Sequence, residues 1–476
     1  MQVIAQMHAA DEAQLSALAR MMAAGARPGQ TILLDGPVGA GKSHFARAFI
    51  RARQGDAAED VPSPTFTLVQ TYDDPLGTEI WHADLYRLTD ASELDELGLD
   101  EALGSAICLI EWPDRLEQAP PGALWLRLVP VAMGAARDVS LSGQGADWPD
   151  LSRAAQRAWF VANAGWADAR VQALAGDASA RRYFRLQDGA RSAILMDDPP
   201  PGSLPAYLAM TDWLRARGFG APQVLAADAA QGLMLAEDLG DDLVARVIAD
   251  DPALAPAIYA RITDLLVDLQ SHAPLDHVRA LDADALADLT ALFAECYVPA
   301  VDAQGGAGIA AAIARLYRDL AGDAPLVLSL RDFHAENLIW RGDAPLGILD
   351  FQDAVAAHPA YDLVSALQDA RRDVDPALES AMIARFVAAT RADADRFGAI
   401  YALLGAQRAL RILGIFARLV IRDGKPRYLA FMPRVWAYLM RDLDHPALAG
   451  LRTMIAPIPA PTADLLERIS AKCPMR

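Results

Sequence analysis

The sequence predicts two folds in succession: an α/β P-loop domain with a mainly parallel sheet, followed by an α+β domain of two lobes. A strand, a glycine-rich loop and a helix follow one another over residues 31–53, and further strands alternate with helical or turn-rich segments to about residue 130. Beyond a turn-rich stretch at residues 143–152, strands come first and Ala/Leu-rich helices follow. A chain of 476 residues that is 53% hydrophobic can fill more than one core.

The first domain is assigned to residues 1–150. Its first predicted element is an amphipathic helix at residues 11–24, where Leu15, Leu18 and Met22 recur at helical spacing. Pro28 and Gly29 then turn the chain into an apolar strand. Strands are predicted at residues 31–35, 79–83, 106–110 and 124–129, and a helix at residues 43–53.

The second domain is assigned to residues 153–476, with a small lobe over about 153–240 and a helical lobe over about 241–476. Hydrophobic patterning predicts its elements. A helix is expected at residues 153–164, strands at 182–186, 193–196 and 232–237, and mostly helices after Asp241.

Composition excludes several classes of protein. A net charge of −19 disfavours unspecific attraction to nucleic acid or anionic lipid, because the average surface potential repels phosphate. Three cysteines without a CxxC spacing form neither a disulfide framework nor a zinc site. No basic and then apolar leader is visible, and no uncharged apolar stretch approaches the ~20 residues of a membrane span. We therefore expect a soluble, cytoplasmic protein.

The glycine-rich loop satisfies the pattern GxxxxGK[ST]. Its glycines let successive backbone N–H groups point at phosphate oxygens, and the following helix adds its positive end. Lys42 reaches the outer phosphates of ATP and Ser43 supplies a hydroxyl to Mg²⁺. The chain has only three lysines, so a lysine here indicates a need for an ammonium group. The predicted nucleotide-binding residues are Gly36, Val38, Gly39, Ala40, Gly41, Lys42 and Ser43.

Two acidic residues follow predicted strands of this sheet. Asp84 comes after the strand at residues 79–83, and Glu111 after the strand at residues 106–110. An acid at the carboxyl end of a strand can reach the metal or orient the attacking water. Strand periodicity does not choose between them.

The words Val61-Pro-Ser-Pro-Thr-Phe-Thr, His82-Ala-Asp-Leu-Tyr-Arg and Ile110-Glu-Trp, after the P-loop, resemble the TsaE family. These are bacterial ATPases that assist threonylcarbamoyladenosine modification of tRNA. The resemblance implies that Ser43, Asp84 and Glu111 gather around Mg²⁺, with Lys42 and Glu111 catalytic and residues 63–67 a switch-like segment. It also implies partner proteins of the TsaB and TsaD type, with tRNA reached only indirectly. The alternative is an assembly module that depends on nucleotide and whose hydrolysis is incidental.

A second catalytic pattern lies almost 300 residues further on. Asp332 stands five residues before Asn337, and Asp350 follows thirteen residues later on an apolar strand. Kinase catalytic loops use this layout, with the first Asp as base and Asn and the later Asp as Mg²⁺ ligands. His334 either braces this loop or is an ordinary structural histidine, and Asp353 is expected to stabilise a turn.

This order of residues resembles the aminoglycoside phosphotransferase branch of the kinase fold, so a kinase-like bilobal domain is expected. That branch usually has a histidine where this chain has Leu330. The words Met196-Asp-Asp-Pro-Pro, Glu237-Asp-Leu-Gly and Tyr361-Asp-Leu, with the stretch at residues 174–186, resemble AmgK, the anomeric N-acetylmuramate/N-acetylglucosamine kinases of cell-wall recycling. The resemblance implies ATP-dependent formation of a sugar 1-phosphate. The alternative is a kinase of another small alcohol, of the aminoglycoside or choline type.

The small lobe lacks the lysine that usually pairs with the α- and β-phosphates, since no lysine occurs between Lys42 and Lys425. Arg181 or Arg182 would supply that charge, or both are simply solvated. Glu237 and Leu239 are expected at the hinge, where backbone groups would meet adenine.

Overall fold

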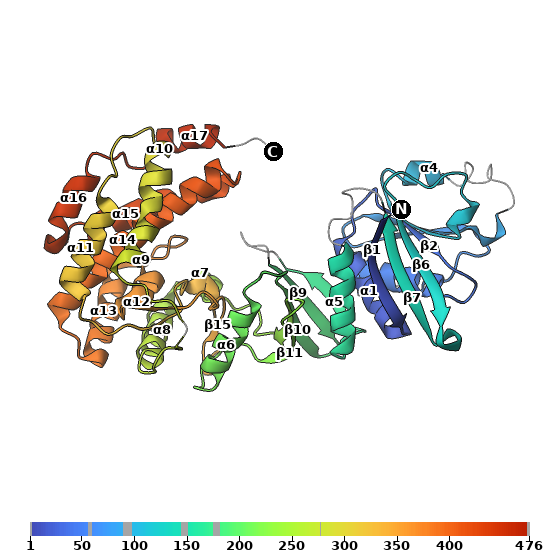
Figure 1. The fold of residues 1–476 in the computed structure, drawn as a ribbon, viewed down its shortest axis with the longest axis horizontal. Helices are drawn as coiled ribbons and strands as arrows, with labels where there is room; N and C mark the ends of the chain where they lie inside the picture. Colours follow the sequence, from blue (N-terminus) through green and yellow to red (C-terminus); the bar gives the residue numbers. More distant parts are fainter. Residues whose placement is uncertain are drawn as a thin grey trace. The chain divides into compact units, whose positions relative to one another are not determined.

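The computed structural model describes residues 2–55, 60–88, 98–143, 151–174, 181–276 and 278–473. The chain forms two compact units (Figure 1). Unit 1 comprises Met1–Pro205 and Gln223–Asp238, and unit 2 comprises Ala206–Pro222 and Leu239–Arg476. The predicted domains, residues 1–150 and 153–476, divide the chain elsewhere. That division stays a prediction, because residues 144–150 lie outside the described residues.

Unit 1 contains a seven-stranded sheet in the order β1-β7-β6-β2-β5-β4-β3. Its strands are β1 Gln2–Ala10, β2 Thr31–Asp35, β3 Val69–Asp73, β4 Glu79–Asp84, β5 Ile107–Glu111, β6 Leu124–Val131 and β7 Ala136–Gly143. The pairs β2–β5, β2–β6 and β4–β5 are parallel, whereas β1–β7, β6–β7 and β3–β4 are antiparallel. The P-loop α/β fold is confirmed, but the mainly parallel sheet holds only for its centre.

Helices α1 Glu12–Gly25, α2 Lys42–Gln54, α4 Leu99–Ala102 and α5 Leu151–Asn163 accompany this sheet. Helix α1 begins at a capping box, in which the Asp11 carboxylate accepts from the Gln14 N–H and the Gln14 side chain accepts from the Asp11 N–H. Its buried face includes Leu15, Leu18 and Met22, as the sequence predicts. Figure 1 shows α1 and α5 side by side, next to β1.

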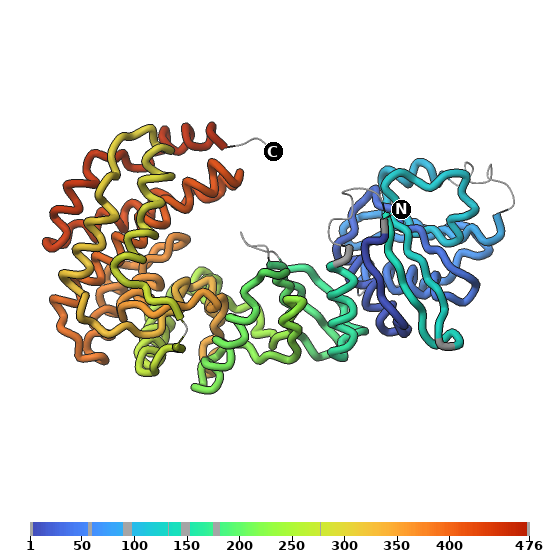
Figure 2. Tube along the Cα trace, viewed as in Figure 1, coloured from blue at the N-terminus to red at the C-terminus, as the bar shows by residue number. Residues whose placement is uncertain are grey.

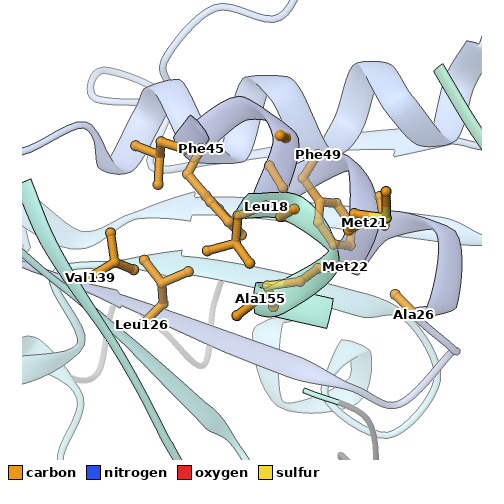
Figure 3. Close-up of a cluster of buried hydrophobic side chains, with 14 of the residues drawn as sticks. Leu18, Met21, Met22, Ala26, Phe45, Phe49, Leu126, Val139 and Ala155 are labelled. Atoms are coloured by element: carbon orange, nitrogen blue, oxygen red, sulfur yellow. The ribbon is translucent and has the colours of Figure 1, made fainter. Parts of the chain in front are cut away.

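A five-stranded antiparallel sheet follows within unit 1, in the order β11-β12-β10-β9-β8. Its strands are β8 Arg170–Ala173, β9 Arg182–Asp188, β10 Arg191–Asp197, β11 Val224–Asp228 and β12 Leu233–Glu237. One hydrophobic cluster runs from Leu126 and Phe45 through Ala155 of α5 to Phe184 and Leu195 of this second sheet. Figure 3 shows Ala155 beside Met22 and Leu126 in that cluster. The two sheets of unit 1 therefore share a core.

Unit 2 is mostly helical, apart from the short strands β13 Val327–Ser329, β14 Leu338–Ile339, β15 Gly347–Ile348 and β16 Val355–Ala357. Its longer helices are α6 Leu204–Arg215 (entered from unit 1), α8 Ala255–Leu269, α9 Ala283–Leu292, α11 Ile309–Ala321, α12 Ala360–Leu367, α13 Pro376–Thr390, α14 Ala394–Ile421, α15 Met432–Asp442 and α17 Ala463–Ala471. Its shorter helices are α7 Val244–Asp250, α10 Val298–Ala300 and α16 Ala449–Ile455. In the second predicted domain, strands β8–β12 precede the long run of helices, which is the order that the sequence predicts.

Helix α14 is the central helix of unit 2. It packs against α9, α11, α12 and α15, and Figure 2 shows the yellow α9 and α11 segments beside it. Of the described helices, α14 alone is long and apolar enough to cross a membrane, and 83% of that apolar window is buried inside the protein.

Candidate nucleotide and catalytic sites

The P-loop joins β2 to α2 through a chain of left-handed glycines. Gly36 has φ 149°, Gly39 has φ 76° and Gly41, the N-cap of α2, has φ 104°. A Cβ added at Gly36 would lie 2.4 Å from the Leu128 carbonyl oxygen, whereas one at Gly39 would meet open space. Gly36 is required for packing against β6, and Gly39 leaves room above the loop for a ligand.

Lys42 lies back over this loop. Its Nζ donates to the Gly36 carbonyl at 2.7 Å and to the Pro37 carbonyl at 3.0 Å, and it sits 3.7 Å from the centroid of the Trp112 ring. Burial lowers the pKa of Lys42, although Glu111 and Asp84 act to raise it. The Lys42 ammonium thus donates to loop carbonyls and lies on the face of an aromatic ring. It occupies the part of the loop where an anion would accept hydrogen bonds.

Asp84 and Glu111 lie beside each other, because β4 and β5 are parallel neighbours and their register pairs these two residues. Both side chains are buried. Ser43 Oγ donates to Glu111 Oε2 at 3.0 Å, and Thr65 Oγ1 donates to Asp84 Oδ2 at 2.6 Å. The structure thus brings Ser43, Asp84 and Glu111 together, and Ser63 and Thr65 of the segment at residues 63–67 contact Asp84.

Sequence reasoning missed His82. Its Nε2 lies 3.0 Å from Glu111 Oε1, and both side chains are almost fully buried. One oxygen of Glu111 therefore faces Ser43 and the other is fixed by His82. The signal was present in the word His82-Ala-Asp, because alternation along a strand places His82 and Asp84 on the same side of β4.

The arrangement suits Mg²⁺. In the described residues no three His, Cys, Asp or Glu side chains cluster as a complete metal cage. One hydroxyl and two carboxylates at the rim of a phosphate-binding loop are what Mg²⁺ needs, since it keeps several waters and takes phosphate oxygens. Ser43, Asp84 and Glu111 would hold it.

The second candidate site comprises the loop after β13 and the segment that follows β15 in unit 2. Asn337 Nδ2 donates to the Asp332 carbonyl oxygen at 2.8 Å, and the Leu349 N–H donates to the Asn337 carbonyl at 2.9 Å. These two hydrogen bonds tie Asn337 to Asp332 and to the residue before Asp350. Arg331, at φ 70°, and Asp350, at φ 56°, both adopt left-handed backbone, which costs non-glycine residues of order 1–3 kcal/mol and is frequent at active sites.

Charges around Asp332 favour its carboxylate form. Burial pushes the pKa of Asp332 upward, but Arg411, Arg408 and Arg331 outweigh burial, so that its pKa lies below the ordinary value. Arg408 donates to the Arg331 carbonyl at 3.3 Å and to Ser365 Oγ at 2.6 Å. Asp332 is therefore ionised and lies among fixed cations.

The main support of this loop is Asp362, which sequence reasoning used only as part of a family word. It is fully buried and accepts from Ser329 Oγ at 2.7 Å, from the Leu330 N–H at 2.6 Å and from the Arg331 N–H at 3.0 Å. Burial raises the pKa of Asp362 to about 6. A single carboxylate on α12 thereby fixes the backbone immediately before Asp332.

His334 and Asp353 lie on the same loops. His334 Nε2 is 3.2 Å from an Arg371 nitrogen, and burial lowers the pKa of His334, which suits a neutral bracing ring. Gln352 Nε2 donates to Asp350 Oδ1 at 2.9 Å and to Asp353 Oδ2 at 3.2 Å. Asp353 therefore helps to hold Asp350 through a shared amide.

The four predicted nucleotide contacts of the small lobe are divided between the units, so their joint role stays a prediction. Arg181 donates to Ser203 Oγ at 2.7 Å, and Arg182 is exposed at the start of β9. The Glu237 N–H donates to the Gln223 carbonyl at 2.8 Å, while Leu239 begins the second segment of unit 2.

Strand β10 ends at Asp197, a carboxylate to which the sequence analysis gave no role. Asp197 is buried and accepts from Arg153 Nε at 2.8 Å and from an Arg157 nitrogen at 2.5 Å. Both arginines lie on α5, so the end of β10 is tied to that helix by ion pairs. Arg185 of β9 pairs with Asp238 at 2.8 Å.

Comparisons with known proteins divide the chain in the same order as the two sites. Residues 9–136 match the family of the threonylcarbamoyl adenosine biosynthesis protein TsaE, and residues 170–400 match the phosphotransferase enzyme family. The N-acetylmuramate/N-acetylglucosamine kinase of Caulobacter vibrioides is 42% identical over 347 residues, covering 63% of this chain and 95% of that protein.

The TsaE protein of Rickettsia bellii is 41% identical over 113 residues, covering 24% of this chain and 77% of that protein. Among solved structures, Bacillus subtilis YdiB is 26% identical with a TM-score of 0.27, covering 33% of this chain and 97% of its own. The chain thus belongs to two enzyme families at once, the TsaE ATPases through its N-terminal part and the N-acetylmuramate/N-acetylglucosamine kinases, within the phosphotransferase enzyme family, through its C-terminal part.

Proposed function

We propose that this chain carries two ATP- and Mg²⁺-dependent activities in the cytoplasm. The C-terminal part phosphorylates the anomeric hydroxyl of N-acetylmuramate or N-acetylglucosamine for cell-wall recycling. The N-terminal part hydrolyses ATP in the service of tRNA threonylcarbamoyladenosine modification. The observation that supports the kinase proposal is the pair of hydrogen bonds by which Asn337 is tied to Asp332 and to Leu349, beside Asp350, in a region 42% identical to a named sugar kinase.

In the kinase reaction, Asp332 aligns the sugar hydroxyl and accepts its proton as the phosphoryl group transfers. Its lowered pKa keeps it a carboxylate at neutral pH. Asn337 and Asp350 would hold Mg²⁺, which neutralises charge on the triphosphate. Asp362 fixes the backbone of Leu330 and Arg331, so that Asp332 is positioned before the substrate arrives.

The proposal of an amino-sugar kinase over a choline or aminoglycoside kinase is supported by the identity to the named kinases. The charges near Asp332 do not choose between them, because Asp332 and Asp353 lie close enough to Arg411 to offset it.

In the N-terminal part, the P-loop backbone and Lys42 would bind the phosphates. Ser43, Asp84 and Glu111 would hold the metal. Glu111, fixed by His82, would also orient the attacking water. Proteins of the TsaB and TsaD type are the proposed partners, and tRNA is reached only through them. Thr65 donates to Asp84, so the segment at residues 63–67 would respond to metal binding at that carboxylate.

The kinase proposal is tested with labelled ATP and a panel of N-acetylmuramate, N-acetylglucosamine, choline and an aminoglycoside. We expect label in the two amino sugars, in a product that weak acid hydrolyses, as a 1-phosphate does. An acid-stable product, or turnover confined to choline or the aminoglycoside, would rule out the anomeric kinase.

The N-terminal proposal is tested by co-purifying the full chain with TsaB and TsaD proteins, with and without ATP, in native and Lys42→Ala forms. We expect ATP to strengthen assembly of the native chain, and the variant not to respond. Equal assembly by both forms would favour a scaffold that needs no nucleotide.

A further inference from the structure

A basic cavity of about 440 Å³ lies in unit 1, apart from the residues of either site described above. It is bounded by α1, α2 and the start of β8. Its ionisable side chains are Arg20 of α1, His44, Arg47 and Arg51 of α2, Asp168 before β8 and Arg170 of β8.

The charge of this cavity is opposite to that of the chain. Four arginines face one aspartate there, in a protein whose net charge is −19. His44 adds no charge at neutral pH: its ring nitrogens contact Ser16 Oγ at 2.6 Å and Glu12 Oε1 at 2.9 Å, and burial lowers its pKa. The positive potential therefore comes from guanidinium groups.

Two of these arginines retain donors for a ligand. Within the described residues, Arg47 is recorded with one acceptor, the Val61 carbonyl, which it reaches through Nε at 3.0 Å. Arg51 lies 3.4 Å from Asp60, and both of these side chains are largely exposed, so that ion pair is weak. Arg20, in contrast, is held by the Ala167 carbonyl and Asp168.

The opposite wall is shaped by Gly55 at the end of α2. A Cβ there would lie 2.9 Å from an Arg170 guanidinium nitrogen, so the absence of a side chain lets Arg170 lie against α2. Guanidinium forks match the oxygens of a phosphate group, and a space of this volume suits a small molecule.

We propose that this cavity binds a small phosphorylated molecule, whose phosphate is shared between Arg47 and Arg51 of α2 and Arg170 of β8. Helix α2 begins at Lys42 and Ser43, so the ligand would bridge the P-loop helix to the first strand of the phosphotransferase-family region. This site serves neither proposed reaction directly, and its test needs no turnover.

The test is site-resolved protection from phenylglyoxal, which modifies accessible arginines, read on the full chain by peptide mass spectrometry. The probes are inorganic phosphate, N-acetylglucosamine 1-phosphate, the neutral sugar N-acetylglucosamine and total tRNA. We expect labelling of Arg51 and Arg170 to fall together, with one midpoint, as N-acetylglucosamine 1-phosphate or phosphate is added. The lower midpoint identifies a sugar phosphate or free phosphate as the better ligand. Arg217, an arginine outside the cavity, should label unchanged.

Replacement of one phosphate-binding arginine sharpens the result. Arg47→Ala should raise the midpoint for protection of Arg170 by about tenfold, the usual loss for a charge-assisted hydrogen bond, whereas Arg217→Ala should not change it. Absence of protection, equal protection of Arg217, or protection by tRNA alone would overturn the proposal.

Discussion

The two candidate sites hold their acidic residues in opposite ways. In unit 1, Asp84 and Glu111 are neighbours in one parallel strand pair, and they accept hydrogen bonds from the hydroxyls of Thr65 and Ser43. In unit 2, the loop of Asp332 is fixed by Asp362 on α12 and by Arg408 on α14.

This difference decides how each site would fail. The P-loop site depends on backbone geometry, in which particular glycines permit the loop to wrap a phosphate. The kinase site depends on buried charges delivered by distant helices. Substitutions should therefore damage the first through strain and the second through lost charge or lost hydrogen bonds.

The largest expected effect separates the two sites by activity. Asp332→Asn should lower sugar phosphorylation by about 10³-fold, because general bases contribute about 10²–10⁴-fold. ATP hydrolysis at the P-loop should be unchanged. Steady-state kinetics of both reactions on one preparation measure this, with Asp353→Asn as a nearby control that should cost less than tenfold. Unaltered sugar turnover in Asp332→Asn would remove Asp332 as the base.

The next effect concerns stability. Asp362→Ala should lower the free energy of unfolding of unit 2 by about 3 kcal/mol, since it leaves two backbone N–H groups and the Ser329 hydroxyl without their acceptor. Calorimetry of the full chain should show the unit 2 transition falling while that of unit 1 stays. Equal loss in both transitions would contradict independent support of the two sites.

The same carboxyl gives a pH dependence. Its pKa rises from an ordinary 3.8 to about 6 on folding, so its stabilising contribution is complete below pH 4 and lost as the pH rises through 6. That difference corresponds to about 3 kcal/mol. A pH series of denaturant unfolding should show this loss for the native chain, and Asp362→Asn should lack it.

A matched pair of glycine substitutions tests strain in the P-loop. Gly36→Ala should cost about 3 kcal/mol of unit 1 stability and Gly39→Ala about 1 kcal/mol, because both have positive φ but only the first brings a Cβ against the Leu128 carbonyl. Urea unfolding measures both. Similar costs would show that the contact with β6 does not constrain the loop.

The smallest expected effect is a shift in a pH profile. Arg411 is the first of the charges that lower the pKa of Asp332, so Arg411→Gln should let burial raise that pKa. The acidic limb of kcat/KM for sugar phosphorylation should then move to higher pH. If the acidic limb did not move, Arg408 and Arg331 alone would be enough to keep the pKa of Asp332 low.

What the sequence predicted follows the same division. The P-loop, the helix at α1 and the central strands were predictable because each signal is local: a glycine pattern, apolar residues at helical spacing, a run of apolar residues. The strands β1, β3 and β7 were not. Strand β1 pairs with β7, far along the chain, whereas β3 and β7 pair with their sequence neighbours β4 and β6 but carry no continuous apolar run.

The supports of the kinase site were hidden for a related reason. Asp332, Asn337 and Asp350 have a fixed spacing and could be assigned roles, whereas nothing in the spacing of Asp362 or Arg408 indicates which loop they meet. Pairing between buried charges that are distant in sequence depends on tertiary packing, which local sequence patterns do not predict.

The core shared through α5 has a consequence for how such a chain could arise or be taken apart. Ala155, Ala158 and Val161 of α5 belong to the same cluster as Leu18 of α1, and that cluster continues to Phe184. The two family regions are therefore more than tethered, because α5, which lies between them, belongs to the shared core. A fragment that ended before α5 would expose the apolar residues of α1 that α5 covers.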